Sequence, residues 1–252
     1  MNNPLNAENI TRLGKIGQKN VDSDKMAVLT HNLGFSIKSQ LGGQSTLLNA
    51  GENTNITYRI LGASLTADDI NHINAIDKQG ERMQSLYDHG CQLEYEAFDS
   101  DSFYCNLLKI DDGLPLLLSR CLVIANTPNS SKDISNVIDT IANENPAQYP
   151  GKDTTVYYSL KMKALLIVSA LGMTASKSWN GAYDANGGYI VVKKDGDIVC
   201  YHFYDRNELE NYLFCNTYFE NASRKRYHFG SIYTGHDSLP RLKLNLQIRF
   251  RS

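Results

Sequence analysis

The sequence lacks the features that mark a zinc protein, a disulfide-rich protein or a membrane protein. Its five cysteines are odd in number and none stands in a C-x-x-C pair, so they predict neither a zinc site nor a disulfide framework. The longest apolar run, Ala164 to Met173, is too short to cross a membrane. With no signal sequence at the N-terminus, these features predict a cytoplasmic protein with reduced thiols.

Several enzyme signatures are also missing. The chain has no G-x-x-x-x-G-K-[ST] loop, no G-x-S-x-G elbow and no H-E-x-x-H pair. Gly230-Ser231-Ile232-Tyr233 resembles a GIY nuclease element, but no second half follows it, and His31-Asn32 lacks the spaced partners of an HNH site. Trp179, the single tryptophan, is more typical of a core or lid residue than of a base-stacking platform.

Charge is distributed unevenly along the 252 residues, although the net charge is only −2. The range 66–113 holds eleven Asp or Glu and three Lys or Arg. The range 223–252 holds seven Lys or Arg and one acid. A basic terminal segment suits contacts with phosphates, and a solvated surface explains the same pattern equally well.

Periodicity predicts a single α/β domain with a mixed central sheet, flanking helices and a β-rich C-terminal part. Polar loops and capping signals separate helices expected at 66–76, 134–141 and 154–172 from strands expected at 56–61, 187–193 and 198–204. We expect irregular strands over 91–125 and a polar loop over 45–53. The proline-containing segment 145–151 is the best candidate for a boundary between the catalytic part and a DNA-facing part, 152–252.

The chain is organised around a predicted catalytic hairpin region that spans residues 22–58. Met26 to Leu29 suits one strand, and Phe35 to Leu41 alternates apolar and polar residues, which predicts a second strand. Ser36, Lys38 and Gln40 share the polar face of that strand. Asp22 or Asp24 opens the first strand, and an acid and a lysine that face the same way can hold a metal ion and a phosphate.

These residues resemble the PD-(D/E)XK nucleases, and Ser36-Ile37-Lys38 occupies the (D/E)XK position with Ser36 in place of the second acid. The chain as a whole is similar to HpaII-type type II restriction endonucleases over roughly residues 20–252. The similarity rests on these segments in order: Gly34-Phe35-Ser36-Ile37-Lys38-Ser39, Leu41-Gly42, Thr46-Leu47-Leu48-Asn49-Ala50, Thr54-Asn55, Tyr58, Ala170-Leu171-Gly172-Met173-Thr174, Trp179-Asn180-Gly181, Tyr183-Asp184-Ala185, Gly187-Gly188-Tyr189-Ile190, Cys200-Tyr201-His202 and Lys243-Leu244-Asn245-Leu246-Gln247-Ile248-Arg249-Phe250.

The resemblance implies a restriction-endonuclease-like fold and a homodimer that cleaves double-stranded DNA with Mg²⁺ at a short site, CCGG in this family. Asp24, with Asp22 as second choice, would hold the metal. Lys38 would contact the scissile phosphate or the attacking water, and Gln40 could order that water. The competing interpretation is a non-catalytic DNA-binding or interaction protein that keeps the fold with an incomplete metal site.

The displaced second carboxylate has one candidate near the hairpin. Glu52 lies fourteen residues after Lys38, and some PD-(D/E)XK enzymes recruit a Glu at about this distance. An exposed loop charge explains Glu52 at least as well. The flanking amides of Asn49 and Asn55 could contact the DNA backbone or simply set the turns of the loop.

The last ten residues before Ser252 form the clearest pattern in the chain. Leucines, an isoleucine and a phenylalanine alternate with polar residues from Leu242 to Arg251, which predicts one strand with a buried face. The polar face contains no acid. Its members are residue types that hydrogen-bond base edges or phosphates, so DNA contact and a structural edge are about equally expected: Lys243, Asn245, Gln247, Arg249 and Arg251.

Overall fold

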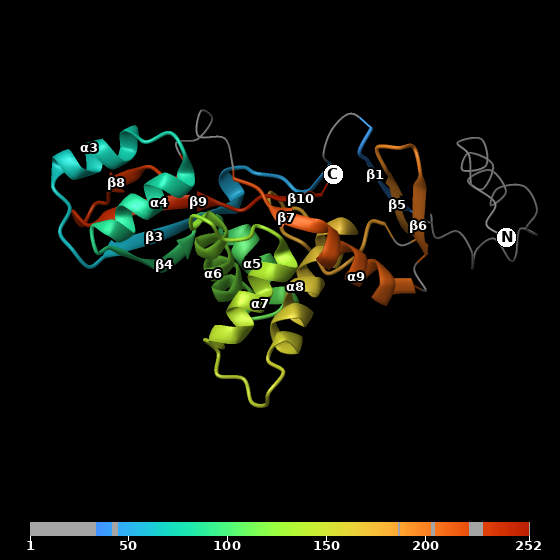
Figure 1. Ribbon diagram of the computed structural model, residues 1–252. Coiled ribbons are helices and arrows are strands. Elements are labelled where there is room, and N and C mark those ends of the chain that lie inside the picture. Colours follow the sequence, from blue (N-terminus) through green and yellow to red (C-terminus); the bar gives the residue numbers. More distant parts are fainter. Residues whose placement is uncertain (1–33, 42–44, 186, 203–204, 222–228, 252) are drawn as a thin grey trace, which may run out of the picture.

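The computed structural model describes residues 34–41, 45–185, 187–202, 205–221 and 229–251. Strands and helices alternate irregularly along the chain, as expected for an α/β protein (Figure 1). The elements in order are β1 (Phe35–Ser39), β2 (Thr46–Leu48), the 3₁₀ helix η1 (Glu52–Thr54), β3 (Asn55–Leu61), α3 (Ala67–Ala75), α4 (Gln79–Asp88), β4 (Gln92–Phe98), α5 (Asp101–Ile110), α6 (Leu114–Asn126), α7 (Ile134–Glu144), α8 (Thr155–Ala170), β5 (Gly188–Val192), β6 (Ile198–His202), α9 (Arg206–Asn216), β7 (Thr217–Phe219), β8 (Ile232–Thr234), β9 (Pro240–Asn245) and β10 (Ile248–Phe250).

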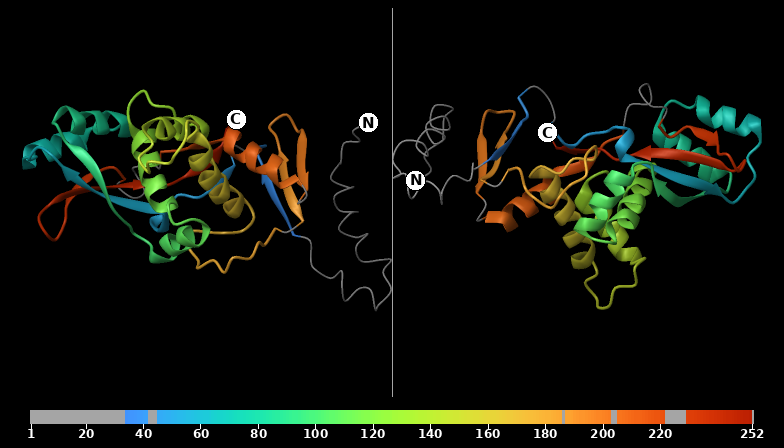
Figure 2. Two further views of the ribbon diagram at one scale, coloured as in Figure 1. Left: turned by 90° about the horizontal axis from the view of Figure 1, so that it is seen from below. Right: turned by 180° about the vertical axis from the view of Figure 1, so that it is seen from behind.

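The α/β class is confirmed, whereas a single central sheet is not. The described strands form three sheets, ordered β1-β5-β6, β2-β10-β7 and β4-β3-β9-β8. Among them only β1-β5-β6 is mixed, because β1 runs parallel to β5 and β6 runs antiparallel to it. The four-stranded sheet, covered by α3 and α4, lies at the opposite end of the molecule from β1-β5-β6 (Figure 2). Helices α5 to α8 pack together on one side of the sheets.

The alternating segment near the C-terminus joins two of these sheets. Its apolar residues are all essentially buried, which confirms the predicted face: Leu242, Leu244, Leu246, Ile248 and Phe250. The prediction of one continuous strand is wrong, because β9 ends at Asn245 and β10 begins at Ile248. Between them Leu246 N–H donates to Thr54 C=O at 2.9 Å, and Gln247 C=O accepts from Glu220 N–H at 3.0 Å. Each half therefore pairs with a different neighbour.

Three helices follow the sequence signals. Thr66 and Asp69 form a reciprocal capping box at the start of α3, and Ile73 on the inner face of that helix is buried. The apolar periodicity of 134–141 becomes α7, and the apolar run after Thr154 becomes α8. None of the helices within the described ranges has both the length and the apolar character needed to span a lipid bilayer.

Two local predictions are wrong. Only β4 is a strand within 91–125, and the remainder forms α5 and α6. The Ser100 side chain caps α5 by accepting from Phe103 N–H, and Pro115 lies in the first turn of α6, where its missing N–H costs nothing. The polar loop expected at 45–53 contains β2, because Leu47 and Leu48 are buried in the core beside β10.

Candidate functional site

The strand β1 carries the predicted polar face toward the interior of the molecule. Residues alternate as expected, and Phe35 and Ile37 are 43% and 57% exposed, whereas Ser36 and Lys38 are half-buried. Ser36 lies beside Tyr189 of β5 in the parallel ladder. The predicted partner strand, Met26 to Leu29, lies outside the described residues. The polar face of β1 is therefore the one directed at the rest of the protein.

Ser36 and Lys38 line a cavity of about 390 Å³ that three distant parts of the chain enclose. The first part is β1. The second is the stretch from β2 through η1, and the third is the C-terminal turn of α8 with the loop that follows it. Its lining residues are Ser36, Lys38, Leu47, Leu48, Asn49, Ala50, Gly51, Asn53, Thr54, Ser169, Ala170, Gly172, Met173, Thr174, Ala175 and Ser176.

Lys38 supplies the cationic group of this cavity. Its partial burial removes water from the ammonium, and this desolvation lowers the pKa of Lys38. None of the described residues forms an ion pair with it. A half-buried cation that has no counter-ion among the described residues favours an anionic ligand, because the ligand restores the interactions that burial removed.

The α8 wall contributes a polar group that sequence reasoning missed. Ser169 is only 8% exposed, and its Oγ is buried with no hydrogen-bond partner in the described part of the chain. A buried hydroxyl is normally hydrogen-bonded, so this one has an unused donor that a rotation of the side chain would turn toward a ligand in the cavity. The sequence offered no signal for it, since a lone serine in an apolar helix is unremarkable.

The loop on the other wall is held by two buried amides. Asn245 Nδ2 donates to Gly51 C=O at 2.7 Å and to Asn55 Oδ1 at 2.7 Å, and it lies 3.1 Å from Thr54 Oγ1. Gly51 N–H in turn donates to Thr54 Oγ1 at 3.2 Å. Asn55 and Asn245 thus set the conformation of the 51–54 turn. Of the predicted loop residues only Asn49 lines the cavity, whereas Glu52 is exposed and does not.

The three walls of the cavity contain several of the segments on which the family resemblance rests. Comparison with known proteins identifies the same family. The sequence model described as "HpaII restriction endonuclease" matches residues 18–250. The chain belongs to the HpaII restriction endonuclease family. A curated relative, "Type II restriction enzyme HpaII" from Haemophilus parainfluenzae, is 41% identical over 223 residues. These cover 88% of this chain and 61% of that enzyme, so the chain spans about three fifths of its relative's length. No solved structure matches.

Gln40 was predicted to belong to the site, and the structure does not bring it to the cavity. Gln40 is only 7% exposed, and its backbone N–H continues the β1–β5 ladder by donating to Val192 C=O at 2.8 Å. Its side-chain amide lies 3.5 Å from Arg251 C=O. Gln40 therefore lies beyond the cavity, at the junction of β1 with the C-terminal segment.

The structure describes only one of the carboxylates predicted to bind the metal, Glu52. Asp22 and Asp24 lie outside the described residues. No group of three or more His, Cys, Asp or Glu side chains within the described ranges is placed to hold a metal ion. The described cavity lining supplies an ammonium, hydroxyls and amides but no carboxylate. These groups fit a phosphate, and by themselves they do not fit Mg²⁺, which requires carboxylate oxygens.

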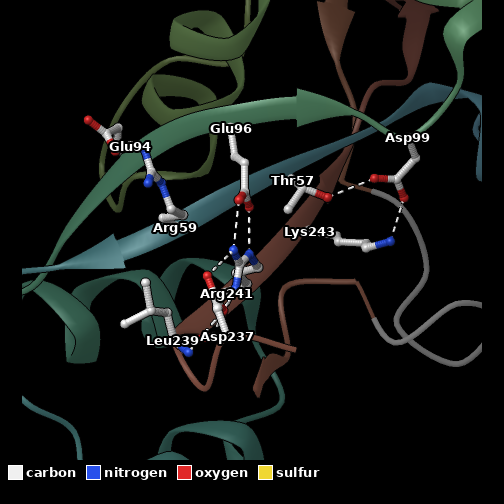
Figure 3. A network of polar contacts seen from close by, with 9 residues as sticks. All are labelled: Thr57, Arg59, Glu94, Glu96, Asp99, Asp237, Leu239, Arg241 and Lys243. Atoms are coloured by element: carbon white, nitrogen blue, oxygen red, sulfur yellow. Dashed lines mark hydrogen bonds and ion pairs between the residues drawn. The ribbon is translucent and has the colours of Figure 1, made fainter. Parts of the chain in front are cut away.

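The basic residues of the C-terminal segment are paired with acids, as Figure 3 shows for Lys243 and Asp99. Lys243 Nζ lies 2.6 Å from Asp99 Oδ2, and Asp99 also accepts from Thr57 Oγ1 at 2.7 Å. Arg249 pairs with Glu220, and Asn245 and Gln247 are buried. Any DNA contact by Lys243 or Arg249 would therefore compete with an existing ion pair.

Proposed function

We propose that this HpaII-family chain is a type II restriction endonuclease that hydrolyses phosphodiester bonds of double-stranded DNA at a short specific site. The observation that carries the proposal is the cavity, which brings Ser36 and Lys38 of β1 together with two walls from distant parts of the chain. We assign β1-β5-β6 as the restriction-endonuclease-like mixed sheet, because the polar face of its edge strand β1 forms one side of this site.

Each described group has a role in phosphodiester hydrolysis. The Lys38 ammonium binds the scissile phosphate and stabilises the charge that develops on it, an effect that is strong where water is excluded. The hydroxyls of Ser36 and Ser169 donate to phosphate oxygens from opposite walls. Asp24, with Asp22 as second choice, is the proposed ligand of Mg²⁺, and Glu52 is the proposed displaced carboxylate. A Mg²⁺ ion held by these carboxylates would act as a Lewis acid.

Symmetry supports the proposed assembly and target. CCGG, the site that the family resemblance implies, reads the same on both strands. A homodimer with a twofold axis presents the same surface to each strand, so one subunit would cut each. Asn49, Asn55, Lys243, Gln247 and Arg249 stay proposed DNA contacts, with Asn49 best placed because it lines the cavity. Asn245, also predicted from the sequence to contact DNA, is instead assigned a structural role, because its amide is buried and used within the protein. We place this activity in the cytoplasm, where restriction acts on incoming DNA.

The first prediction tests the function itself. Purified chain incubated with plasmid that contains CCGG sites is expected to give discrete fragments with Mg²⁺ and none with excess EDTA. Agarose gels and fragment-end sequencing measure both activity and site. The absence of a carboxylate among the described cavity residues favours the competing function, a DNA-binding protein without catalysis. Retarded but intact CCGG duplex in the presence of Mg²⁺ would establish that alternative and refute cleavage.

The second prediction concerns the unpartnered hydroxyl of Ser169. Ser169→Ala is expected to lower kcat/KM by about tenfold or more, because a hydrogen bond to a charged group contributes about 1.5–3 kcal/mol. The free energy of unfolding should not fall, because the hydroxyl has no described partner to lose.

Ser119→Ala is the matched control for Ser169. Ser119 is also a buried helical serine, but its hydroxyl donates to Leu116 C=O at 2.8 Å and lies outside the cavity lining. This control should leave kcat/KM unchanged. Equal cleavage by Ser169→Ala and wild type would exclude Ser169 from the phosphate site.

A further inference from the structure

The α8 wall of the cavity is completed by a segment without regular secondary structure. Residues 171–187 form neither helix nor strand where they are described, yet Gly172, Met173, Thr174, Ala175 and Ser176 all line the cavity. Such a segment has no ladder to satisfy its backbone N–H and C=O groups, so its conformation depends on partners elsewhere. The position of this wall relative to Lys38 is therefore set by whatever binds its backbone.

Asn106 of α5 provides those partners. It is 0% exposed, and its Nδ2 donates to Lys177 C=O at 2.8 Å and to Thr174 C=O at 3.3 Å. Its Oδ1 accepts from Trp179 N–H at 2.8 Å. The Asn106 side chain thus uses both amide hydrogens and its carbonyl oxygen on the backbone of one segment. Packing alone would not require these three hydrogen bonds.

Lys109, one turn further along α5, binds the same segment from the exposed side. Its Nζ donates to Trp179 C=O at 2.7 Å and lies 3.4 Å from Ser178 Oγ. Residues three apart on a helix share a face, so Asn106 and Lys109 form one anchor for residues 174–179. Neither side chain lines the cavity itself.

We propose that Asn106 is a positioning residue of the nuclease site, which fixes the 174–179 segment and so holds the cavity wall that faces Lys38. The proposal rests on the proposed function and extends it to a residue in a different element from those that line the site. A wall displaced by about 1 Å can reduce a rate by about a hundredfold when it sets the position of the reacting groups. A looser wall also admits water to Lys38, which shifts the pKa of that lysine toward its ordinary value.

The test compares Asn106→Ala with a matched control, Asn126→Ala. Asn126 is likewise a buried helical asparagine, but the one acceptor of its Nδ2 among the described residues is Leu122 C=O one turn back, at 2.8 Å. Three quantities are measured for each variant: Tm, kcat with KM on a CCGG duplex, and the pKa of Lys38. The last comes from the pH dependence of amine-reagent labelling, followed at the Lys38 peptide by mass spectrometry.

Both variants are expected to lose Tm, and Asn106→Ala alone should lower kcat, by about tenfold to a hundredfold, with KM little changed. Asn106→Ala alone should also raise the pKa of Lys38. Lys109→Ala, at an exposed position, should shift both quantities in the same direction by a smaller amount, and it replaces Asn106→Ala if that variant does not fold.

The two proposals fail in distinguishable ways. If the wild type does not cleave DNA, the proposed function is refuted, and the Lys38 pKa still decides whether Asn106 positions the wall. A Lys38 pKa and kcat equal to the wild type in folded Asn106→Ala, or equal to those of Asn126→Ala, would overturn the positioning role and leave Asn106 as a packing residue.

Discussion

Replacing Lys38 with alanine is expected to reduce cleavage of plasmid DNA by about 10²–10³-fold or more, while DNA binding is largely retained. This range is the usual cost of removing one group that stabilises transition-state charge in a water-excluded site. Lys38 is the only lysine or arginine among the residues that line the described cavity, so no neighbour there can replace it. Single-turnover cleavage, with binding measured separately in Ca²⁺, separates the two effects.

The fold of the variant should be preserved. The Lys38 ammonium is partly desolvated, and its removal breaks no ion pair with any of the described acids. Lys194→Ala, in the turn between β5 and β6 of the same sheet, is the matched control and should cleave as the wild type does. Wild-type cleavage by Lys38→Ala would place the active site elsewhere.

The pH dependence gives a second test of the same residue. Lys38 binds phosphate as a cation, which is the form present below its pKa, and burial lowers that pKa. Cleavage should therefore decline as pH rises, at a lower pH than an exposed lysine would give. The decline should be absent from any residual activity of Lys38→Ala. An alkaline limb that is identical in wild type and variant would mean that another group titrates.

The parts of the fold that could be predicted are those in which a few neighbouring residues determine the local structure. The capping box at Thr66 is complete within four residues, and α3 begins there. The segment 91–125 was wrongly predicted as strands because acidic residues interrupt its apolar pattern. Ser100 and Pro115 mark the starts of α5 and α6, but these residues are recognised as helix starts only once the helices are known. The division of the C-terminal strand at Leu246–Gln247 depends on partners in β3 and β7, which no local pattern reveals.

The site divides in the same way. Ser36 and Lys38 could be predicted as candidate site residues because they form a short motif on one strand. The structure places both in the lining of one cavity. Ser169 and Asn106 carry no motif, and the roles proposed for them rest on tertiary contacts with residues far away in the chain. The carboxylate that would complete the site is not among the described cavity residues, so Asp24 and Asp22 stay a prediction.

The C-terminal segment leads to the last prediction, for which Asn245 is the best residue. The sequence pattern allowed either DNA contact or a structural role. Asn245 is 5% exposed, and both hydrogens of its Nδ2 are used within the protein, on Gly51 C=O and Asn55 Oδ1. Truncation leaves the buried Asn55 carbonyl oxygen without this donor and releases the turn that lines the cavity.

Asn245→Ala is therefore expected to lower the free energy of unfolding by about 1–3 kcal/mol, the usual cost of a buried polar group left unsatisfied. Cleavage should fall with it, because Gly51, Asn53 and Thr54 form one cavity wall, while the preference for CCGG over altered sites stays constant. Denaturant unfolding and cleavage of duplexes with single-base changes measure these quantities. Lys243→Ala, two residues earlier with its half-exposed Asp99 pair, should cost less than about 1 kcal/mol. An Asn245→Ala variant of unchanged stability and relaxed site preference would instead show that this amide reads a base.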